Sequence, residues 1–411
     1  MMGGQLEVRT AALACLGVAA CLLLLARRRR RTHGAAHTAL RDLGRDSGLK
    51  VTVLGQGGAP LGDLFRKLDD RTALKAVAMA HELGIAYYDT SPWYGTGLSE
   101  MRCGLALHRL PRTSFVFQTK VGRYLVPDPA AKNGTSVGWI GGLHMGVKFD
   151  YSASAFERQI QDSLQRTGLG YIDSVVIHDL EPTPHRNPAA GDDGIATACR
   201  HLATLRESGF AALQRMRADG VIKAFGAGVN IDEDGEDEHV KREWNREYVR
   251  ILLGMPTERA RGIDFLLLAN MHSLLSHEAS SLGILDDCLA AGVAVVIGGP
   301  YSSGILATGA DPPDGSTPKF NYQPASEAVR ARVRRIERVC DRHGVPLIAA
   351  ALQYPLRHPA VCSVIPGGAT ADEVASNVAL LNATIPEGLW QDLERERLLP
   401  MLLPPPVKWL R

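Results

Sequence analysis

Four polar residues of this chain lie at or just beyond the ends of strand-like apolar segments. Asp89 follows "IAYY" and Lys120 follows "FVFQT". His178 follows "SVVI", and Tyr94 lies in a Pro/Gly-rich turn five residues beyond Asp89. Packing alone does not require an aspartate and a tyrosine at that spacing. A carboxylate, an ammonium, a phenol and an imidazole can together move a proton to or from a substrate oxygen.

The chemistry of this set depends on the pKa of Tyr94. A free tyrosine has a pKa of about 10, so near neutral pH it is a poor base and a slow acid. We expect the Lys120 ammonium to lower this pKa by about two or three units, with Asp89 holding the lysine in place. His178 can hydrogen-bond the same oxygen. The sequence presents no nucleophile elbow, carboxylate pair or metal-ligand cluster, so the set favours carbonyl–carbinol interconversion with hydride transfer by a cofactor.

The elements that position these residues alternate between strand-like and helix-like segments from Val51 onward, which is typical of a parallel sheet wrapped by helices. In "SASAFERQIQDSLQRTGLG", Phe156, Ile160 and Leu164 recur every four residues, as one buried helical stripe requires. The predicted strands are 51–58, 85–90, 115–120, 171–178, 222–230, 263–273, 293–300 and 360–368.

About eight βα units in roughly 340 residues fit a closed (β/α)8 TIM barrel better than an open doubly wound sheet. Functional groups of such a barrel gather at the C-terminal ends of its strands, so we expect the four polar residues at one mouth. Three stretches are predicted to be loop insertions: Val126–Lys148, Pro182–Ala198 and Ile231–Arg261. The last contains the acidic run "DEDGEDEH", which is typical of a solvated surface loop.

Composition bounds the class of protein. The chain has 411 residues, 45% of them hydrophobic, and a net charge of +2. That hydrophobic content suffices for a large core, and the near-neutral charge argues against nucleic acid as a partner. Seven scattered cysteines fit buried thiols in a reducing compartment better than a disulfide framework. A small-molecule partner is expected, and the oligomeric state stays open.

The N-terminal residues 1–34 differ from the rest. The apolar run Ala11–Ala26 is followed at once by the arginine cluster Arg27–Arg31. It falls short of the roughly 20 residues that span a bilayer, but residues 6–31 predict a membrane contact with the remainder facing the cytosol. The alternatives are an organellar presequence that is cleaved and a disordered extension. Residues 35–49 are then a linker, and residues 50–411 form the barrel.

Three segments resemble the aldo-keto reductase family over about residues 50 to 395. They are "YYDTSPWYGTGLSEMRCGLAL", "TKVGR" and "SVVIHDLE". The resemblance implies that Asp89, Tyr94, Lys120 and His178 form a catalytic tetrad with Tyr94 as proton donor or acceptor. "SPWYGTGLSE", "VGRYLVP" and "IKAFGAGVN" are most similar to the aldose dehydrogenase branch, which includes D-threo-aldose 1-dehydrogenase, L-galactose dehydrogenase and pyridoxal 4-dehydrogenase. That branch oxidises a cyclic hemiacetal to a lactone.

The resemblance also implies an extended nicotinamide dinucleotide across the barrel mouth. "GVN" is similar to the segment that holds the carboxamide, "GGPYSSGIL" to the loop over the pyrophosphate, and "PGGATADEVASN" to the adenosine site. Backbone amides of Ser303 and Gly304 are expected to face the pyrophosphate. The implied cofactor residues are Gly57, Asn230, Tyr301, Ser303, Gly304, Gly367, Thr370, Glu373 and Asn377.

Two departures from the family pattern bear on the cofactor. NADP-dependent relatives place Lys or Arg where this chain has Gly367, Ala369 and Glu373. A carboxylate there repels a 2′-phosphate and accepts from ribose hydroxyls, so NAD is favoured over NADP. Ala269 and His272 stand where many relatives have Gln and Tyr near the nicotinamide, with Tyr301 a candidate substitute for the tyrosine.

The expected substrate contacts are Trp93, Tyr124 and Trp139, in loops that should ring the mouth. Aromatic platforms suit both sugars and a flat pyridine ring, so they do not discriminate between these substrates. The leading prediction is an NAD(P)-dependent dehydrogenase of an aldose hemiacetal, with L-fucose- or L-galactose-like substrates. The alternatives are a broad-specificity NADPH carbonyl reductase and a non-catalytic, membrane-tethered subunit that binds a dinucleotide.

Overall fold

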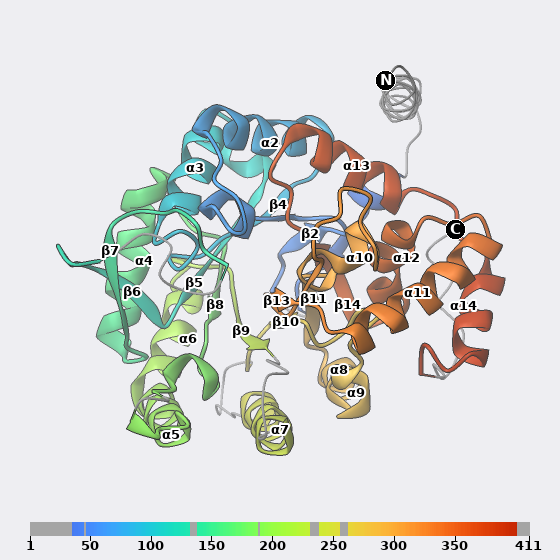
Figure 1. Ribbon diagram of the computed structural model, residues 1–411. Coiled ribbons are helices and arrows are strands. Elements are labelled where there is room, and N and C mark those ends of the chain that lie inside the picture. The colour runs from blue at the N-terminus through green and yellow to red at the C-terminus, as the bar shows by residue number, and fades with distance from the viewer. Residues whose placement is uncertain are drawn as a thin grey trace.

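The computed structural model describes residues 35–44, 47–131, 138–187, 190–230, 238–254 and 262–400. Eight parallel strands form its central sheet, in the order β14-β11-β10-β9-β8-β5-β4-β3. They are β3 (Gln56–Gly57), β4 (Tyr87–Asp89), β5 (Val116–Val121), β8 (Ser174–Ile177), β9 (Ala224–Asn230), β10 (Phe265–Ala269), β11 (Ala294–Gly298) and β14 (Val361–Ile365). Figure 1 shows these strands at the centre of a ring of helices.

The sheet closes on itself between its first and last strands. Leu54 pairs with Val364, and Gly57 pairs with Gly367, both in parallel bridges. A Cβ added to Gly57 would lie 2.7 Å from the Ile365 carbonyl oxygen, so only glycine permits this approach. The predicted (β/α)8 barrel is therefore confirmed.

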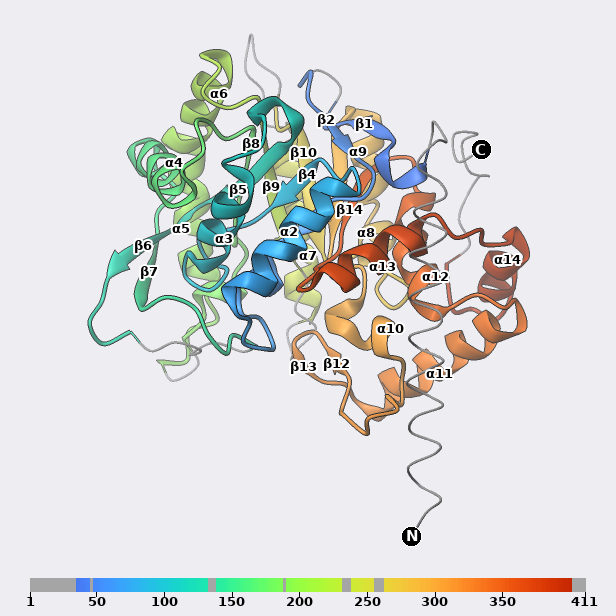
Figure 2. The same cartoon turned by 90° about the horizontal axis from the view of Figure 1, so that it is seen from above.

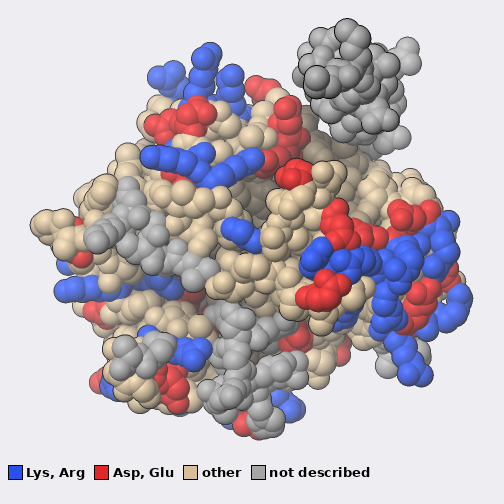
Figure 3. Space-filling model, viewed as in Figure 1, with Lys and Arg blue, Asp and Glu red and all other residues tan. Residues whose placement is uncertain are grey.

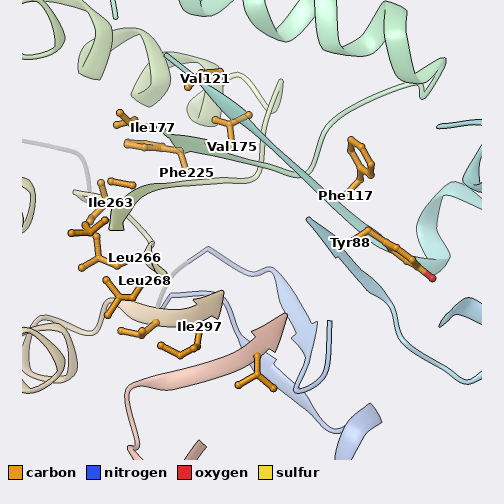
Figure 4. Close-up of a cluster of buried hydrophobic side chains, with 14 of the residues drawn as sticks. Tyr88, Phe117, Val121, Val175, Ile177, Phe225, Ile263, Leu266, Leu268 and Ile297 are labelled. Carbon is orange, nitrogen blue, oxygen red and sulfur yellow. The ribbon is translucent and has the colours of Figure 1, made fainter. Parts of the chain in front are cut away.

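Alternation along the strands divides the barrel into an inner and an outer face. Tyr87, Val116 and Val176 belong to an apolar cluster inside the barrel, and the same strand faces carry Asp89 and Lys120 nearer the C-terminal ends. The outward side chains pack beneath the helices. Figure 4 shows part of this outer cluster, including Tyr88, Phe117, Val175, Ile177, Phe225, Leu266 and Ile297. Because both faces are buried, the strands are continuous apolar runs.

Helices connect successive strands. The helices are α2 (Asp70–Glu82), α3 (Leu98–Leu107), α4 (Ala153–Thr167), α5 (Ile195–Thr204), α6 (Phe210–Ala218), α7 (Glu238–Gly254), α8 (Glu278–Ser281), α9 (Ile284–Ala291), α10 (Ile305–Thr308), α11 (Glu327–Arg342), α12 (Leu347–Gln353), α13 (Ala371–Leu381) and α14 (Glu387–Arg395). Local signals set their ends. Ser152 caps α4 by accepting from the Ala155 amide, and Gly168, at φ 65°, ends that helix.

The N-terminal part differs from its prediction. The predicted strand 51–58 is split, because Val51 and Thr52 lie in β2 (Lys50–Thr52) whereas the barrel strand β3 begins at Gln56. β2 pairs antiparallel with β1 (Leu40–Asp42), which lies in the stretch predicted to be a linker. Leu43, Leu49 and Val51 join the apolar cluster inside the barrel, so this hairpin is part of the barrel's packing rather than a tether.

The predicted insertions have different structures. The two ends of Val126–Lys148 lie in a pair of antiparallel strands, β6 (Arg123–Pro127) and β7 (Met145–Phe149), which projects from the barrel at the left of Figure 2. Trp139 pairs with Leu64 in an antiparallel bridge, and residues 132–137 lie outside the described residues. Pro182–Ala198 holds a short 3₁₀ turn and the start of α5. Ile231–Arg261 was wrongly predicted to be only an insertion, because it contains α7, the crossover helix between β9 and β10. Residues 232–237 of the acidic run lie outside the described residues.

The apolar N-terminal run and its arginine cluster also lie outside the described residues. Within the described ranges, no helix has the length and hydropathy needed to cross a bilayer. Charges on the face in Figure 3 are intermixed in sign at the right, where α11 and α14 lie. Arg334, for example, pairs with Asp311 at 2.6 Å and Arg342 pairs with Glu396.

Candidate active site

A buried ion pair lies inside the barrel near its C-terminal end, which we call the mouth. The Lys120 Nζ donates to Asp89 Oδ1 at 2.9 Å and Oδ2 at 2.7 Å, and to the Thr90 carbonyl at 2.8 Å. Lys120 is 1% exposed and Asp89 2% exposed. All three ammonium protons have acceptors, which is the condition under which a buried charge is tolerated. Strand alternation puts both residues on the inner face, as predicted.

Gln118 is a member of this network that the sequence analysis missed. Its Oε1 accepts from the Tyr87 hydroxyl and the Ser174 hydroxyl, both at 2.9 Å. These two donors orient the amide, so that Nε2 donates to Asp89 Oδ1 at 2.8 Å. A signal for it existed, because Gln118 precedes Lys120 by two residues on the same strand and must share its inner face.

Tyr94 lies beside this ion pair. The Lys120 Nζ is 4.6 Å from the centroid of the Tyr94 ring, over its face. Burial raises the pKa of Tyr94 well above its usual value, and the negative charges of Asp89 and Asp179 raise it further. The predicted lowering by Lys120 is therefore wrong for the protein without ligand. The ammonium protons all point to other acceptors, and Arg123 is the cation that opposes the rise.

His178 follows β8 at the mouth, and its ring centroid lies 6.3 Å from that of Tyr94 in an edge-on arrangement. Burial lowers the pKa of His178 to about 3, because charging the ring in this environment is costly. The imidazole is therefore neutral at physiological pH. Its Nδ1 lies 3.2 Å from Asp179 Oδ2 and 3.4 Å from the Ser91 hydroxyl. A proton on Nδ1 facing the carboxylate leaves Nε2 available to a substrate hydroxyl.

Of the predicted substrate contacts, two lie beside Tyr94. The Trp139 ring stacks on the Tyr94 ring at 5.7 Å, and the Trp93 ring meets Trp139 edge-on at 6.1 Å. Tyr124 instead lies under the Arg158 guanidinium of α4, at 5.6 Å, on the opposite face of β6 from its neighbour Arg123. The placement of Tyr124 at the mouth was therefore wrong, because alternation along β6 turns it away.

Comparison with known proteins identifies the family. The model of the aldo/keto reductase family matches residues 53–395. The chain belongs to this family. It is 36% identical to pyridoxal 4-dehydrogenase of Microbacterium luteolum, over 87% of this chain and 97% of the relative. It is 32% identical to D-threo-aldose 1-dehydrogenase of a Pseudomonas species, over 86% of this chain and 96% of the relative.

The fold agrees with solved structures. An aldo-keto reductase of Bacillus halodurans superposes with a TM-score of 0.59 at 24% identity, covering 87% of this chain and 96% of that one. The family match and the named dehydrogenase relatives, rather than the superposition, make the present chain an NAD(P)-dependent oxidoreductase. Within the described ranges, no cluster of three or more His, Cys, Asp or Glu residues is arranged to hold a metal ion.

The predicted carboxamide residue, Asn230, ends β9 at the mouth of the aldo-keto reductase. Its side-chain amide donates to Glu181 Oε1 and lies 3.5 Å from Asp179 Oδ1. Its carbonyl accepts from the Asn245 side chain at 2.9 Å. Two acidic residues near the nicotinamide segment, Asp179 and Glu181, were missed, although they lie one and three residues after His178 in the sequence.

The loop after β11 also lies at the C-terminal end of the strands. Ser302, Ser303 and Gly304 have positive φ angles of 48°, 60° and 112° in succession, a backbone bend that suits a phosphate group. The prediction that the Gly304 amide faces a ligand is wrong, because it donates to the Tyr301 carbonyl at 2.9 Å. The Tyr301 hydroxyl donates to Asn377 Oδ1 at 2.6 Å, which joins this loop to α13.

The predicted adenosine residues surround the start of α13. Thr370 caps this helix by accepting from the Glu373 amide at 3.2 Å. Glu373 is not a free carboxylate, because it forms an ion pair with Arg66 and accepts from the Ala369 amide at 2.8 Å. Arg66 was missed, since it lies 307 residues away in the sequence. Polar groups thus lie at the ends of β9, β11 and β14, and the prediction that they hold an extended dinucleotide stays a prediction.

His272 and Ala269 are the second departure from the family pattern near the nicotinamide. His272 lies 2% exposed outside the barrel, with its ring centroid 5.1 Å from that of Tyr354, a residue of the outer helical layer. Both ring nitrogens are buried. Ala269, by contrast, ends β10 at the mouth. His272 therefore does not take the place of a tyrosine stacked on the nicotinamide.

Replacing His272 is expected to reduce the acid sensitivity of the protein. Burial lowers the pKa of His272 to about 3, whereas in the unfolded chain it is about 6.5. Between these values the unfolded state binds one more proton, so the free energy of unfolding falls by about 1.4 kcal/mol per pH unit as the pH decreases. His272→Leu should remove this contribution. Urea unfolding at pH 7, 6 and 5 measures the slope, and an unchanged slope would contradict the prediction.

Proposed function

We propose that this aldo-keto reductase oxidises the cyclic hemiacetal of an aldose, or of a pyridoxal-like aldehyde, to the corresponding lactone, with NAD as the favoured cofactor. The observation that carries the proposal is the convergence of Tyr94, His178 and the Asp89–Lys120 ion pair at one mouth. The relatives at 36% and 32% identity, whose names refer to pyridoxal and to D-threo-aldoses, support the substrate class.

The proposed reaction balances as a two-electron oxidation. C1 of the hemiacetal loses a hydride, its hydroxyl loses a proton, and the C1–O bond becomes the carbonyl of the lactone. The nicotinamide, when bound, supplies the hydride acceptor and, in its oxidised form, a positive charge. Tyr94 in its phenolate form accepts the proton at Oη as general base, and the resulting phenol releases a proton to solvent after turnover.

The protein's own residues prepare this step. The Asp89–Lys120 pair is neutral as a whole and holds the Lys120 ammonium over the Tyr94 ring, while Arg123 is the cation whose charge favours the phenolate. His178 is uncharged, so it orients a substrate hydroxyl through a hydrogen bond without adding charge to the site. The Trp139 ring, stacked on the Tyr94 ring, shields that side of the phenol from water.

The preference for NAD rests on Glu373 and Arg66. The two side chains are about half exposed and paired, so the Arg66 guanidinium is already neutralised at the start of α13. A 2′-phosphate at this position would have to compete with the Glu373 carboxylate for Arg66 and would be repelled by it. A ribose with free hydroxyls meets neither cost, and the carboxylate accepts hydrogen bonds from such hydroxyls.

A substrate panel tests the proposal. The full chain is mixed with NAD or NADP and with L-fucose, L-galactose, D-arabinose or pyridoxal, and formation of the reduced cofactor is followed by absorbance. We expect turnover with NAD for at least one of the four compounds and a lactone as the product. Reduction of simple aldehydes with NADPH and no oxidation of the four would instead identify a carbonyl reductase. Dinucleotide binding without any turnover would identify a non-catalytic subunit.

Tyr94→Phe should abolish oxidation while leaving the affinity for the dinucleotide nearly unchanged, since the change removes only the proton acceptor. Because burial and nearby acidic groups raise the pKa of Tyr94, the wild-type oxidation rate should rise with pH as the phenol deprotonates. Steady-state kinetics from pH 6 to 10 and fluorescence titration of the cofactor measure both quantities. Oxidation that persists in the Phe variant would refute the role of Tyr94.

Glu373→Gln should improve NADP-dependent turnover at least tenfold, because Arg66 is released to pair with the 2′-phosphate. The kcat/KM with NAD should change less than threefold. The double variant Arg66→Ala/Glu373→Gln is the matched control, and it should lose the gain with NADP. Equal use of the two cofactors by the wild-type enzyme, or an equal gain in the double variant, would contradict the assignment of cofactor preference to this pair.

A further inference from the structure

The residue that begins β6, Arg123, is brought to the mouth by the turn after Lys120. Gly122 makes this turn with a φ of 111°. A Cβ at Gly122 would lie 2.6 Å from the Tyr151 ring and 2.9 Å from the His178 carbonyl, so the turn requires glycine. The chain leaving β5 therefore passes directly over the segment that carries His178.

The Arg123 guanidinium is held between two aromatic rings. Its Cζ lies 4.3 Å from the Trp93 ring centroid and 4.7 Å from that of Phe149. Its Nε forms an ion pair with Asp179 Oδ2 at 2.5 Å, and the side chain is 11% exposed. Asp179 is the neighbour of His178, and Trp93 is the neighbour of Tyr94. The guanidinium therefore lies beside the segments that carry His178 and Tyr94, and its charge lowers the pKa of both side chains.

The terminal nitrogens of Arg123 differ from its Nε in their contacts. Within the described ranges, neither Nη1 nor Nη2 donates a hydrogen bond to the protein, whereas Nε faces Asp179. These Nη groups form a planar fork whose donors match two neighbouring oxygen atoms. Because the rings and the carboxylate fix the side chain in advance, binding a ligand costs little further ordering of the guanidinium.

The local charge disfavours an anionic ligand. Among the described residues, each of the two cations at the mouth is already paired with a buried acid, Lys120 with Asp89 and Arg123 with Asp179. His178 adds no charge near neutral pH. A phosphate or carboxylate entering this site would lose its hydration without finding a net positive charge. Uncharged hydroxyl oxygens meet no such penalty, and the Trp93 ring offers an apolar surface beside them.

We propose that Arg123 is the specificity-determining residue of this site, and that its Nη groups donate to two adjacent hydroxyl oxygens of an uncharged, polyhydroxylated substrate. This inference rests on the proposed function for the identity of the reacting carbon. The new element is that Arg123 makes the enzyme prefer polyhydroxylated substrates over simple aldehydes and over phosphorylated sugars.

The test compares Arg123→Lys with the wild-type enzyme. Lysine keeps the ion pair with Asp179 and the fold but lacks the fork of two Nη donors. For the sugar that the enzyme oxidises best, KM should rise about tenfold to a hundredfold, as expected for the loss of one or two hydrogen bonds. For reduction of benzaldehyde, which has no hydroxyls, kcat/KM should fall by a clearly smaller factor, because lysine keeps a positive charge at this position and only the Nη donors are lost. Arg158→Lys is the matched control, since Arg158 also lies over an aromatic ring but is 64% exposed on α4.

A binding measurement separates this inference from the proposed reaction. Calorimetry with a 1,5-anhydro sugar alcohol, which has no anomeric hydroxyl, should show at least tenfold weaker binding to Arg123→Lys, and no binding of its phosphate ester to the wild type. If the wild type oxidises no sugar but this difference in binding persists, the proposed reaction fails and the role of Arg123 stands. Unchanged binding in Arg123→Lys, an equal loss of activity with benzaldehyde, or tighter binding of the phosphate ester would overturn the inference.

Discussion

The ion pair between Asp89 and Lys120 is the interaction on which this site depends. Two charges are buried inside an apolar barrel, and removing either partner would leave the other uncompensated at a cost of about 3–5 kcal/mol. The surroundings satisfy them almost completely, through Gln118, the Thr90 carbonyl and the two carboxylate oxygens. The apolar cluster beneath the pair excludes water from the interior of the barrel. The two charges therefore depend on each other and on their hydrogen-bond partners, which the strands hold in place.

This arrangement has an electrostatic consequence at the mouth. The protons of the Lys120 ammonium are hydrogen-bonded to Asp89 and to the Thr90 carbonyl. The ammonium therefore acts on Tyr94 through the face of its ring rather than through a hydrogen bond to its oxygen. Burial and two carboxylates then dominate the pKa of Tyr94, with Arg123 as the opposing cation. The acid–base behaviour of the phenol thus depends on the whole charge set at the mouth, and a bound oxidised cofactor adds a positive charge to it.

Structural features that depend on neighbouring residues in the sequence could be predicted. The alternation of strands and helices predicted the barrel, and a polar residue at the end of an apolar strand predicted Asp89, Lys120 and His178 at one mouth. The same period-two argument would have placed Gln118 beside Lys120, and it would have turned Tyr124 away had β6 been recognised as a strand. The hairpin β1–β2 was missed because strands this short carry almost no periodic signal.

The sequence by itself determined the fold class and which polar residues stand at the ends of the strands, because strand period and strand ends are local properties of the chain. Only the tertiary structure decided which charges meet. Arg66 pairs with Glu373 across 307 residues, and Arg123 reaches Asp179 through a glycine turn. The tertiary structure also reversed the expected shift of the pKa of Tyr94, which is raised rather than lowered. Burial and the orientation of each donor depend on contacts between distant segments, which no local pattern contains.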